Sequence, residues 1–229
     1  MHNGENRVVL TPPQKEIQTA ARAFAKGEFH PNLTLELERN RQFPGKIWKK
    51  AGDLGFIGIQ YPESVSGGDL GIFEACLIAE SFCSIDSSLG IALSLSGIGS
   101  EAVHRFANDR LKQSLLPDIC QGKQLSGIAF SENPHGLDLS SIHTQAIFKE
   151  GIIVINGKKT HVAARGAAGG YLVLCKTPTH GSDEAPLSRS LSMVWVEGDQ
   201  KGVTFIDSGQ KFAVNMMRSC DMVLNDVQV

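Results

Sequence analysis

The hydrophobic period of this chain changes once, close to Gly122, and this change restricts the possible folds more than any other feature of the sequence. Before Gly122, apolar residues such as Ile17, Ala21 and Phe24 recur three or four positions apart, the spacing of one face of an α-helix. After it, short apolar runs are separated by turn residues, which is the pattern of β-strands. Helices followed by strands predict an α+β fold made of two packed units, not an alternating βαβ arrangement. We place the two units at residues 1–123 and 124–229.

Local signals divide the first unit into helices. Thr11 is suited to an N-cap and Pro12 to the first helical position. Gln14 stands at the third helical position, where it can complete a capping box with Thr11. After this first helix, the apolar pattern predicts four more, over residues 44–54, 70–83, 84–105 and 108–116. Residues 84–105 are almost free of charge, so we expect that helix to be central and buried on all sides. Pro117 is expected to end the last helix.

The second unit is expected to contain short strands joined by tight turns. The predicted strands cover residues 126–131, 144–149, 151–155, 171–175, 192–196, 202–206 and 220–224. Lys149-Glu150-Gly151 predicts a hairpin connection between two of them, and Asn156-Gly157 predicts a further turn.

Composition and charge narrow the classes of function. A formal net charge of -2 over 229 residues gives no electrostatic reason to expect nucleic acid or an anionic membrane as a partner. Neither the 5 cysteines nor the 7 histidines show the spacing of metal ligands, so we expect reduced thiols and no metal site. The sequence shows no signal peptide and no apolar run of membrane-spanning length, which predicts a soluble cytoplasmic protein.

Two segments of the second unit carry a family resemblance. Residues 127–138 read GIAFSENPHGLD, and residues 154–166 read VINGKKTHVAARG. They resemble the flavin-binding middle domain of acyl-CoA dehydrogenases, whose corresponding segments are close to A-L-T-E-P-x-A-G-S-D and N-G-x-K-x-W-I-T-N-G. In the first unit, residues 55–68 are similar to the family's G-F-x-G-I-x-x-P-E-x-x-G-G.

These motifs occur in family order between Thr11 and Val229. The resemblance implies an all-α N-terminal helical domain followed by a β-barrel middle domain. It implies a flavoprotein that carries out α,β-dehydrogenation of an acyl thioester, with FAD as the hydride acceptor. The substrate would be an acyl-CoA or an acyl-carrier protein, electrons would pass to an electron-transfer flavoprotein, and the protein would form a homo- or hetero-oligomer.

A complete family member continues with a four-helix C-terminal domain that carries the catalytic glutamate. This sequence stops at Val229, before such a domain, so the resemblance implies no catalytic residue in it. We therefore expect the chain to be inactive alone.

The resemblance also implies six cofactor-binding residues: Ala129, Phe130, Ser131, Gly136, His161 and Ala163. Main-chain groups of the first three would meet the pyrimidine edge of the flavin, and the Ser131 hydroxyl would bond the ring. Gly136 would let the backbone approach the phosphates. Glu132 and Asp138 match acidic positions of the family and are expected to be solvated, with local bonds to the backbone.

Three positions hold a different side chain from the one usual in the family. Leu137 replaces a serine that meets the pyrophosphate, His161 replaces a tryptophan, and Ala163 replaces a threonine. An unmade hydrogen bond to a charged phosphate costs roughly 1.5–3 kcal/mol, or about tenfold or more in affinity. The sequence leaves two main hypotheses: a flavoprotein fragment of the dehydrogenase family, or a non-catalytic binding or scaffolding partner of an active paralogue. A flavin monooxygenase on the same fold is a third, without positive support in the sequence.

Overall fold

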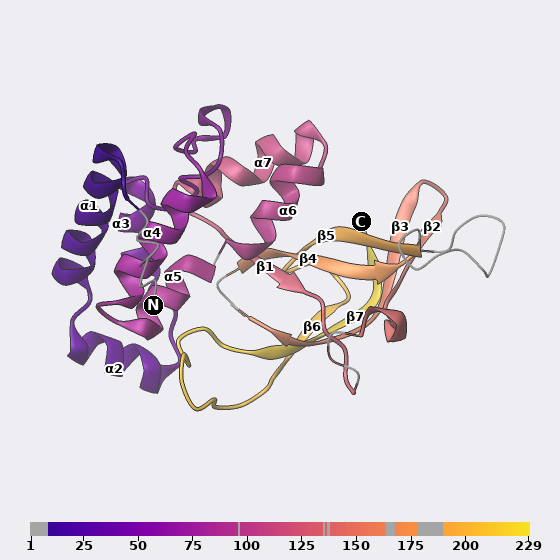
Figure 1. Cartoon of the computed structure of the whole chain (residues 1–229). Helices are drawn as coiled ribbons and strands as arrows, with labels where there is room; N and C mark the ends of the chain where they lie inside the picture. The colour runs from indigo at the N-terminus through magenta and orange to yellow at the C-terminus, as the bar shows by residue number, and fades with distance from the viewer. Residues whose placement is uncertain (1–8, 96, 135, 137, 164–167, 178–189) are drawn as a thin grey trace, which may run out of the picture.

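The structure is a computed structural model, which describes residues 9–95, 97–134, 136, 138–163, 168–177 and 190–229. In this part of the chain, the helices gather at one end of the molecule and the strands at the other (Figure 1). The helices are α1 (Pro12–Glu28), α2 (Pro31–Asn40), α3 (Gly45–Asp53), α4 (Ile72–Cys83), α5 (Ser87–Leu95), α6 (Ile98–Phe106) and α7 (Asp109–Cys120). The order of helices followed by strands confirms the predicted α+β class.

Helix starts follow the local signals in the sequence. The Gln14 main-chain N–H donates to the Thr11 hydroxyl at 3.4 Å, and the Thr11 N–H donates to Gln14 Oε1 at 2.9 Å. The predicted capping box of α1 is therefore present. Asn108 caps α7 in a similar way, since its Oδ1 accepts from the Leu111 N–H at 2.9 Å.

Three helix predictions need correction. Pro117 lies inside α7 and does not end it, because the next turn is buried and its packing offsets the one lost main-chain donor. The sequence reasoning missed α2, although Pro31 at its first position is a helix-start signal. The predicted helix over residues 84–105 is two helices, α5 and α6, because the first turn of α6 packs against the strands. Leu95 and Ile98, on either side of the break, are exposed and not buried.

The strands form one curled sheet, made of β1 (Leu125–Ala129), β2 (Gln145–Lys149), β3 (Ile152–Val162), β4 (Ala168–Lys176), β5 (Leu191–Glu197), β6 (Val203–Asp207) and β7 (Cys220–Gln228). They pair in the order β1-β4-β2-β3-β7-β6, and β5 pairs with β4. β1 and β2 run parallel to β4. The curl brings Tyr171 of β4 against Phe205 of β6, with ring centroids 5.2 Å apart. The expected barrel is thus a half-barrel, in which the described residues of β5 and β6 do not pair with each other.

The two turn signals of the strand half have different outcomes. Glu150 and Gly151 have φ values of 48° and 90° and connect β2 to β3 as the predicted hairpin. Asn156-Gly157 is not a turn, because β3 continues through it with a shift of register against β7. The Asn156 side chain instead donates to Asp226 Oδ1 at 3.0 Å and accepts from the Asp226 N–H at 2.9 Å, which ties β3 to the bulge that β7 forms at this shift.

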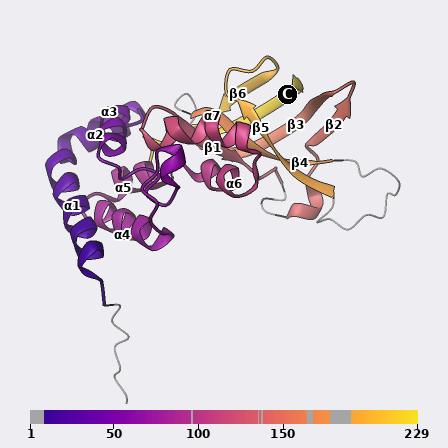
Figure 2. The same ribbon diagram turned by 90° about the horizontal axis from the view of Figure 1, so that it is seen from above.

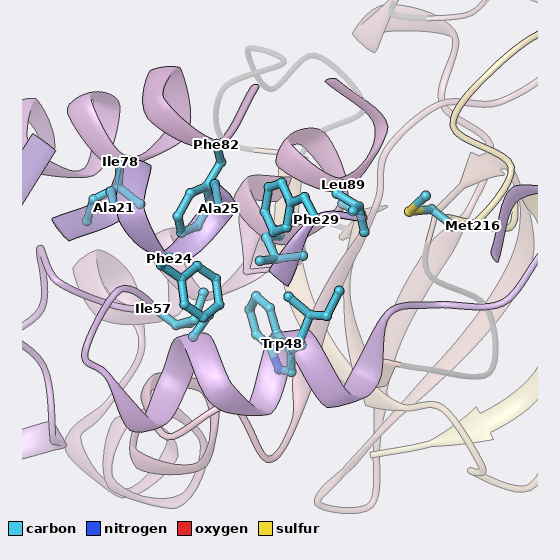
Figure 3. Close-up of a cluster of buried hydrophobic side chains, with 14 of the residues drawn as sticks. Ala21, Phe24, Ala25, Phe29, Trp48, Ile57, Ile78, Phe82, Leu89 and Met216 are labelled. Carbon is cyan, nitrogen blue, oxygen red and sulfur yellow. The ribbon is translucent and has the colours of Figure 1, made fainter. Parts of the chain in front are cut away.

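The two halves of the molecule share hydrophobic cores. In the cluster of Figure 3, Phe24 lies against Phe82 with ring centroids 5.5 Å apart, and Met216 reaches the cluster from the connection between β6 and β7. A second cluster packs α6 and α7 against Leu172 of β4 and Trp195 of β5. Figure 2 shows the same relation from above, with α6 and α7 beside the sheet. Helices α6 and α7 therefore pack against β4 and β5 of the sheet.

Candidate functional site

The candidate site is the edge where the chain leaves β1 and runs beside the second half of β3, which we call the β1–β3 edge. It comprises residues 129–134, residue 136 and residues 159–163. The Thr160 main-chain N–H donates to the Ser131 carbonyl oxygen at 2.8 Å. Lys159 Nζ donates to the carbonyl oxygen of the preceding residue, Phe130, at 3.1 Å. The two segments that the sequence singled out therefore lie side by side.

Ser131 offers hydrogen-bond donors at this edge. Its carbonyl oxygen accepts hydrogen bonds from Thr160, but neither its main-chain N–H nor its hydroxyl has an acceptor among the described residues. Ser131 is partly exposed, whereas Ala129 is fully buried at the end of β1. A ring that carries acceptor atoms along one side, as a flavin does, fits this donor set.

Glu132 follows Ser131 and is buried, so the prediction of a solvated carboxylate is wrong. Lys159 Nζ donates to its carboxylate at 2.8 Å, and the Thr144 hydroxyl does so at 2.6 Å. The main-chain N–H groups of His143 and Thr144 donate to it at 2.7 and 3.0 Å. Burial by itself would raise the pKa of Glu132, but the bond from Lys159 and those from Thr144 and His143 lower it to about 2.

Lys159 is a site residue that the sequence reasoning missed. The alternation of buried and exposed side chains along β3 could have indicated its burial. Side chains two positions apart share a face of a strand, and Ile155 and Lys159 are four apart. Because Ile155 is fully buried, Lys159 is expected on the buried face, and its side chain is 0% exposed. A buried lysine needs an anionic partner, which explains why Glu132 is buried as well.

The loop after Glu132 has an open turn at Gly136. The Gly136 N–H donates to the Glu132 carbonyl oxygen at 2.8 Å, its φ is 60°, and a Cβ there would have no heavy atom of the described residues within 4 Å. A ligand can therefore approach the main chain closely at this position. Asp138 accepts from the N–H and the hydroxyl of Ser140 at 3.0 and 2.6 Å, which are the local bonds that were predicted. Leu137 lies outside the described residues.

His161 and Ala163, the last two predicted cofactor-binding residues, lie near the end of β3 and have different surroundings. A bulge between Lys159 and Val162 leaves His161 with a φ of 57° and an exposed side chain. Ala163 is partly buried and packs against the core of the helical half. A ligand at the surface can reach the imidazole of His161, whereas the methyl group of Ala163 belongs to the helix–sheet junction.

An apolar cavity in the helical half is a second feature that the sequence reasoning missed. Its volume is about 310 Å³, and it is lined mainly by α4, by the junction of α5 and α6 and by the motif segment after α3. Its wall includes Tyr61 and Ser100, whose hydroxyl oxygens lie 2.8 Å apart. Burial raises the pKa of Tyr61 to about 12, so the phenol is protonated at neutral pH. The Ser100 N–H donates to Ser126 Oγ of β1 at 3.0 Å, which fixes the wall to the strand that leads to Ser131.

Metal sites and membrane spans are absent from the part of the chain that the structure describes. No group of three or more His, Cys, Asp or Glu side chains there is arranged to hold a metal ion. Within the same residues, no helix combines the length and the apolar character that crossing a bilayer requires. The cysteines Cys76, Cys83, Cys120, Cys175 and Cys220 are free.

Known proteins resemble both halves of the chain. Residues 11–123 match the family model for the acyl-CoA dehydrogenase N-terminal domain, and residues 127–227 match that for the acyl-CoA dehydrogenase middle domain. The mitochondrial isobutyryl-CoA dehydrogenase of Dictyostelium discoideum is 26% identical over 97% of this chain and 52% of its own length. The benzylmalonyl-CoA dehydrogenase of Aromatoleum aromaticum is 30% identical over 85% of this chain and 50% of its own. The chain thus spans about half the length of these relatives.

Solved structures agree with the sequence matches. The acyl-CoA dehydrogenase from Geobacillus kaustophilus superposes with a TM-score of 0.84 at 25% identity, covering 96% of this chain and 57% of that one. An acyl-CoA dehydrogenase complexed with FAD from Bacillus anthracis gives a TM-score of 0.83 at 27% identity, covering 96% and 36%. Two domain models in the family order, together with structures of the same fold, lead to one conclusion: the chain belongs to the acyl-CoA dehydrogenase family.

Proposed function

We propose that the β1–β3 edge binds FAD and that the chain provides the flavin-binding part of an oxidoreductase of the acyl-CoA dehydrogenase type. The observation that carries this proposal is Ser131, whose N–H and hydroxyl have no acceptor among the described residues. The Bacillus anthracis relative, an acyl-CoA dehydrogenase, was solved in complex with FAD. When bound, FAD would supply the acceptor for a hydride from the substrate.

The residues of the edge would hold and orient the flavin. The donors of Ser131 and the main chain beside it would meet the acceptor atoms along one side of the ring. The open turn at Gly136 would lie against phosphate oxygens, and the exposed imidazole of His161 would lie against the ring. Ala163 would contribute only its main chain.

We extend the proposal to an acyl thioester, on CoA or on a carrier protein, as the substrate. The cavity of about 310 Å³ is mostly apolar, and each buried methylene of an acyl chain would stabilise binding by about 0.8 kcal/mol. Its wall is tied to β1 at Ser126. At ~3.3 Å per residue along an extended chain, Ser126 lies at most about 17 Å from Ser131. The proposal requires that an acyl chain in the cavity present its thioester end to the β1–β3 edge.

The reaction would also need a carboxylate that removes the α-proton. Glu132 does not suit this role, because its oxygens accept four hydrogen bonds and its pKa is lowered to about 2, far below the working pH of a general base. We therefore propose that Glu132 is not the base and, following the family resemblance, that turnover needs a carboxylate from residues outside this sequence. Electrons would then pass to an electron-transfer flavoprotein. The oligomeric state and a cytoplasmic location remain predictions.

A second candidate function is that of a non-catalytic binding or scaffolding partner of an active paralogue. Ala163 favours it, because this residue packs against the helical core and has no hydroxyl to offer a flavin. Under this alternative the fold and the cavity keep their structural role, and the β1–β3 edge holds no cofactor.

Reconstitution with FAD separates the two candidates. Wild-type protein incubated with FAD should keep the flavin through gel filtration, and Ser131→Ala should weaken the affinity by about tenfold through the loss of one hydrogen bond. Ser114→Ala is the matched control, since the hydroxyl of Ser114 is exposed on α7 and donates to the Leu111 carbonyl oxygen of the same helix. A wild-type protein that retains no flavin would favour the non-catalytic partner. Equal affinities in the two variants would contradict the role of Ser131.

A further inference from the structure

We infer that Lys159 is a positioning residue that polarises the peptide group between Phe130 and Ser131, and that this peptide group then favours the reduced form of the bound flavin. The inference rests on the proposed function, because it concerns the same β1–β3 edge. It goes beyond flavin binding as such, since it predicts a difference in affinity between two oxidation states.

Lys159 has a fixed and dry place in the sheet. Its side chain is 0% exposed, and its ammonium donates to Glu132 Oε1 at 2.8 Å and to the Phe130 carbonyl oxygen at 3.1 Å. A charge acts more strongly on a neighbouring dipole in such an environment than it does in water. The Phe130 carbonyl therefore lies in the field of a dry ammonium, which the carboxylate of Glu132 on the same ammonium partly offsets.

The peptide group passes this effect to Ser131. Its C–N bond has partial double-bond character, so electron density drawn to the Phe130 oxygen leaves the Ser131 N–H more strongly polarised. That N–H has no acceptor among the described residues and belongs to the donor set of the edge. Hydrogen bonds strengthen as the acceptor becomes more negative, and reduction adds electron density to the flavin ring. The polarised donor should therefore stabilise the reduced ring more than the oxidised one.

Glu132 keeps the ammonium in this position. Besides Lys159, its carboxylate accepts from three donors just before β2, two of which belong to Thr144. Thr144 in turn lies against Gly157 of β3, where a Cβ would come within 2.3 Å of the threonine hydroxyl. The pair is thus built into the contact of β2, β3 and the loop after β1. A buried pair with so many fixed partners has little freedom to move.

The test compares FAD-loaded wild type with two variants. Lys159→Met/Glu132→Gln removes both charges and keeps a side-chain oxygen that can accept from Thr144. Lys158→Met is the matched control, because Lys158 is the preceding residue of β3, is 54% exposed and pairs with Asp221 at 2.8 Å. Circular dichroism reports folding, fluorescence quenching reports the affinity for oxidised FAD, and spectroelectrochemistry reports the two-electron potential.

We expect the double variant to fold and to bind oxidised FAD, while its preference for reduced over oxidised flavin falls by about tenfold. This corresponds to a potential about 30 mV more negative for a two-electron couple. Lys158→Met should leave the potential unchanged. A merely structural role of the pair would weaken both oxidation states equally and would leave the potential of the double variant at the wild-type value. That result would overturn the inference but would not affect the proposal that the wild type binds FAD.

Failure of the wild-type protein to bind FAD is a different outcome, and it would overturn the proposed function together with this inference. Should the double variant not fold, NMR spectroscopy of the wild-type chain answers the same question. A bond from the ammonium should move the Phe130 carbonyl carbon and the Ser131 amide proton downfield. Ordinary shifts at both nuclei would overturn the inference without any need for the variant.

Discussion

Two clusters of charged side chains in this molecule have similar chemistry and different surroundings. At the β1–β3 edge, Glu132 pairs with Lys159, and their side chains are 9% and 0% exposed. Where β6 ends near α2, Asp207 pairs with Arg41 at 2.6 Å and with Arg218 at 2.9 Å, and all three side chains are between 24% and 41% exposed. Burial makes the first pair a fixed part of the sheet, whereas water and salt weaken the second cluster.

The partly exposed cluster lies beside the connection between β6 and β7, which polar and apolar contacts join to the helical half. Arg41 also donates to the Gly209 carbonyl oxygen at 2.8 Å, and the Asn215 N–H donates to Glu38 Oε2 at 2.7 Å. Next to Asn215, Met216 enters the core of the helical half (Figure 3). We therefore expect the methionine to contribute more to the contact between the halves than the exposed charges do.

The largest effect is expected for Lys159→Met. This change leaves the carboxylate of Glu132 buried without its cation, which costs about 3–5 kcal/mol in free energy of unfolding. Urea denaturation followed by circular dichroism measures the loss. Lys158→Met, in the neighbouring exposed position, should cost at most about 1 kcal/mol. Similar losses in the two variants would remove the distinction between the buried and the exposed charges.

Met216→Ala should follow, with a loss of about 2–3 kcal/mol, because the side chain is 1% exposed and its removal leaves a cavity in the core. Phe212→Ala is the control in the same connection, since Phe212 is fully exposed. Denaturation midpoints of the two variants provide the comparison. If Phe212→Ala proved the more destabilising change, the loop would not be anchored through its methionine.

A smaller effect should appear when the pH is lowered. The folded-state pKa of Glu132 is lowered from 4.5 to about 2, so the stability that its ionised form contributes is complete above about pH 4.5 and is lost as the pH falls toward 2. Glu132→Gln has no such group to titrate. The advantage of wild type over Glu132→Gln in free energy of unfolding should therefore shrink across this range. An advantage that did not change with pH would show that ionisation of Glu132 does not stabilise the fold.

The smallest effect is expected for Asp207→Asn. Hydrogen bonds from Arg41, from the Gly209 N–H and from Arg218 hold the pKa of Asp207 well below its usual range, but the carboxylate is partly exposed to solvent. The melting temperature should fall slightly at low ionic strength and should match that of wild type at high ionic strength. A lower melting temperature of Asp207→Asn that persists in high salt would show that this cluster stabilises the fold as a buried pair does.

The sequence predicted those parts of the fold that depend on neighbouring residues. The capping box at Thr11 and the hairpin at Glu150-Gly151 are confirmed, because each involves residues only a few positions apart. The predictions that Pro117 ends its helix and that Asn156-Gly157 forms a turn are wrong. The conformation at each position depends on partners that folding brings in from elsewhere, namely the packing of α7 and the contact with β7.

The candidate site was predictable in part. The family resemblance pointed to two segments, and the structure lays the end of β1 beside β3, although flavin binding by these residues remains a proposal. The burial of Glu132 was missed because its partner, Lys159, is 27 residues away. The cavity was missed because it exists only where α4, the α5–α6 junction and the segment after α3 come together.

Titration of FAD into isotope-labelled wild-type protein, followed residue by residue by NMR, tests the central claim most directly. If the β1–β3 edge binds the flavin, the amide signals of Ser131, Gly136 and His161 should shift together and saturate with one dissociation constant. The amide of Ser100, in the wall of the cavity, should move little. Signals of the edge that stay in place throughout the titration, or shifts confined to the helical half, would contradict the assignment of this edge as the flavin site.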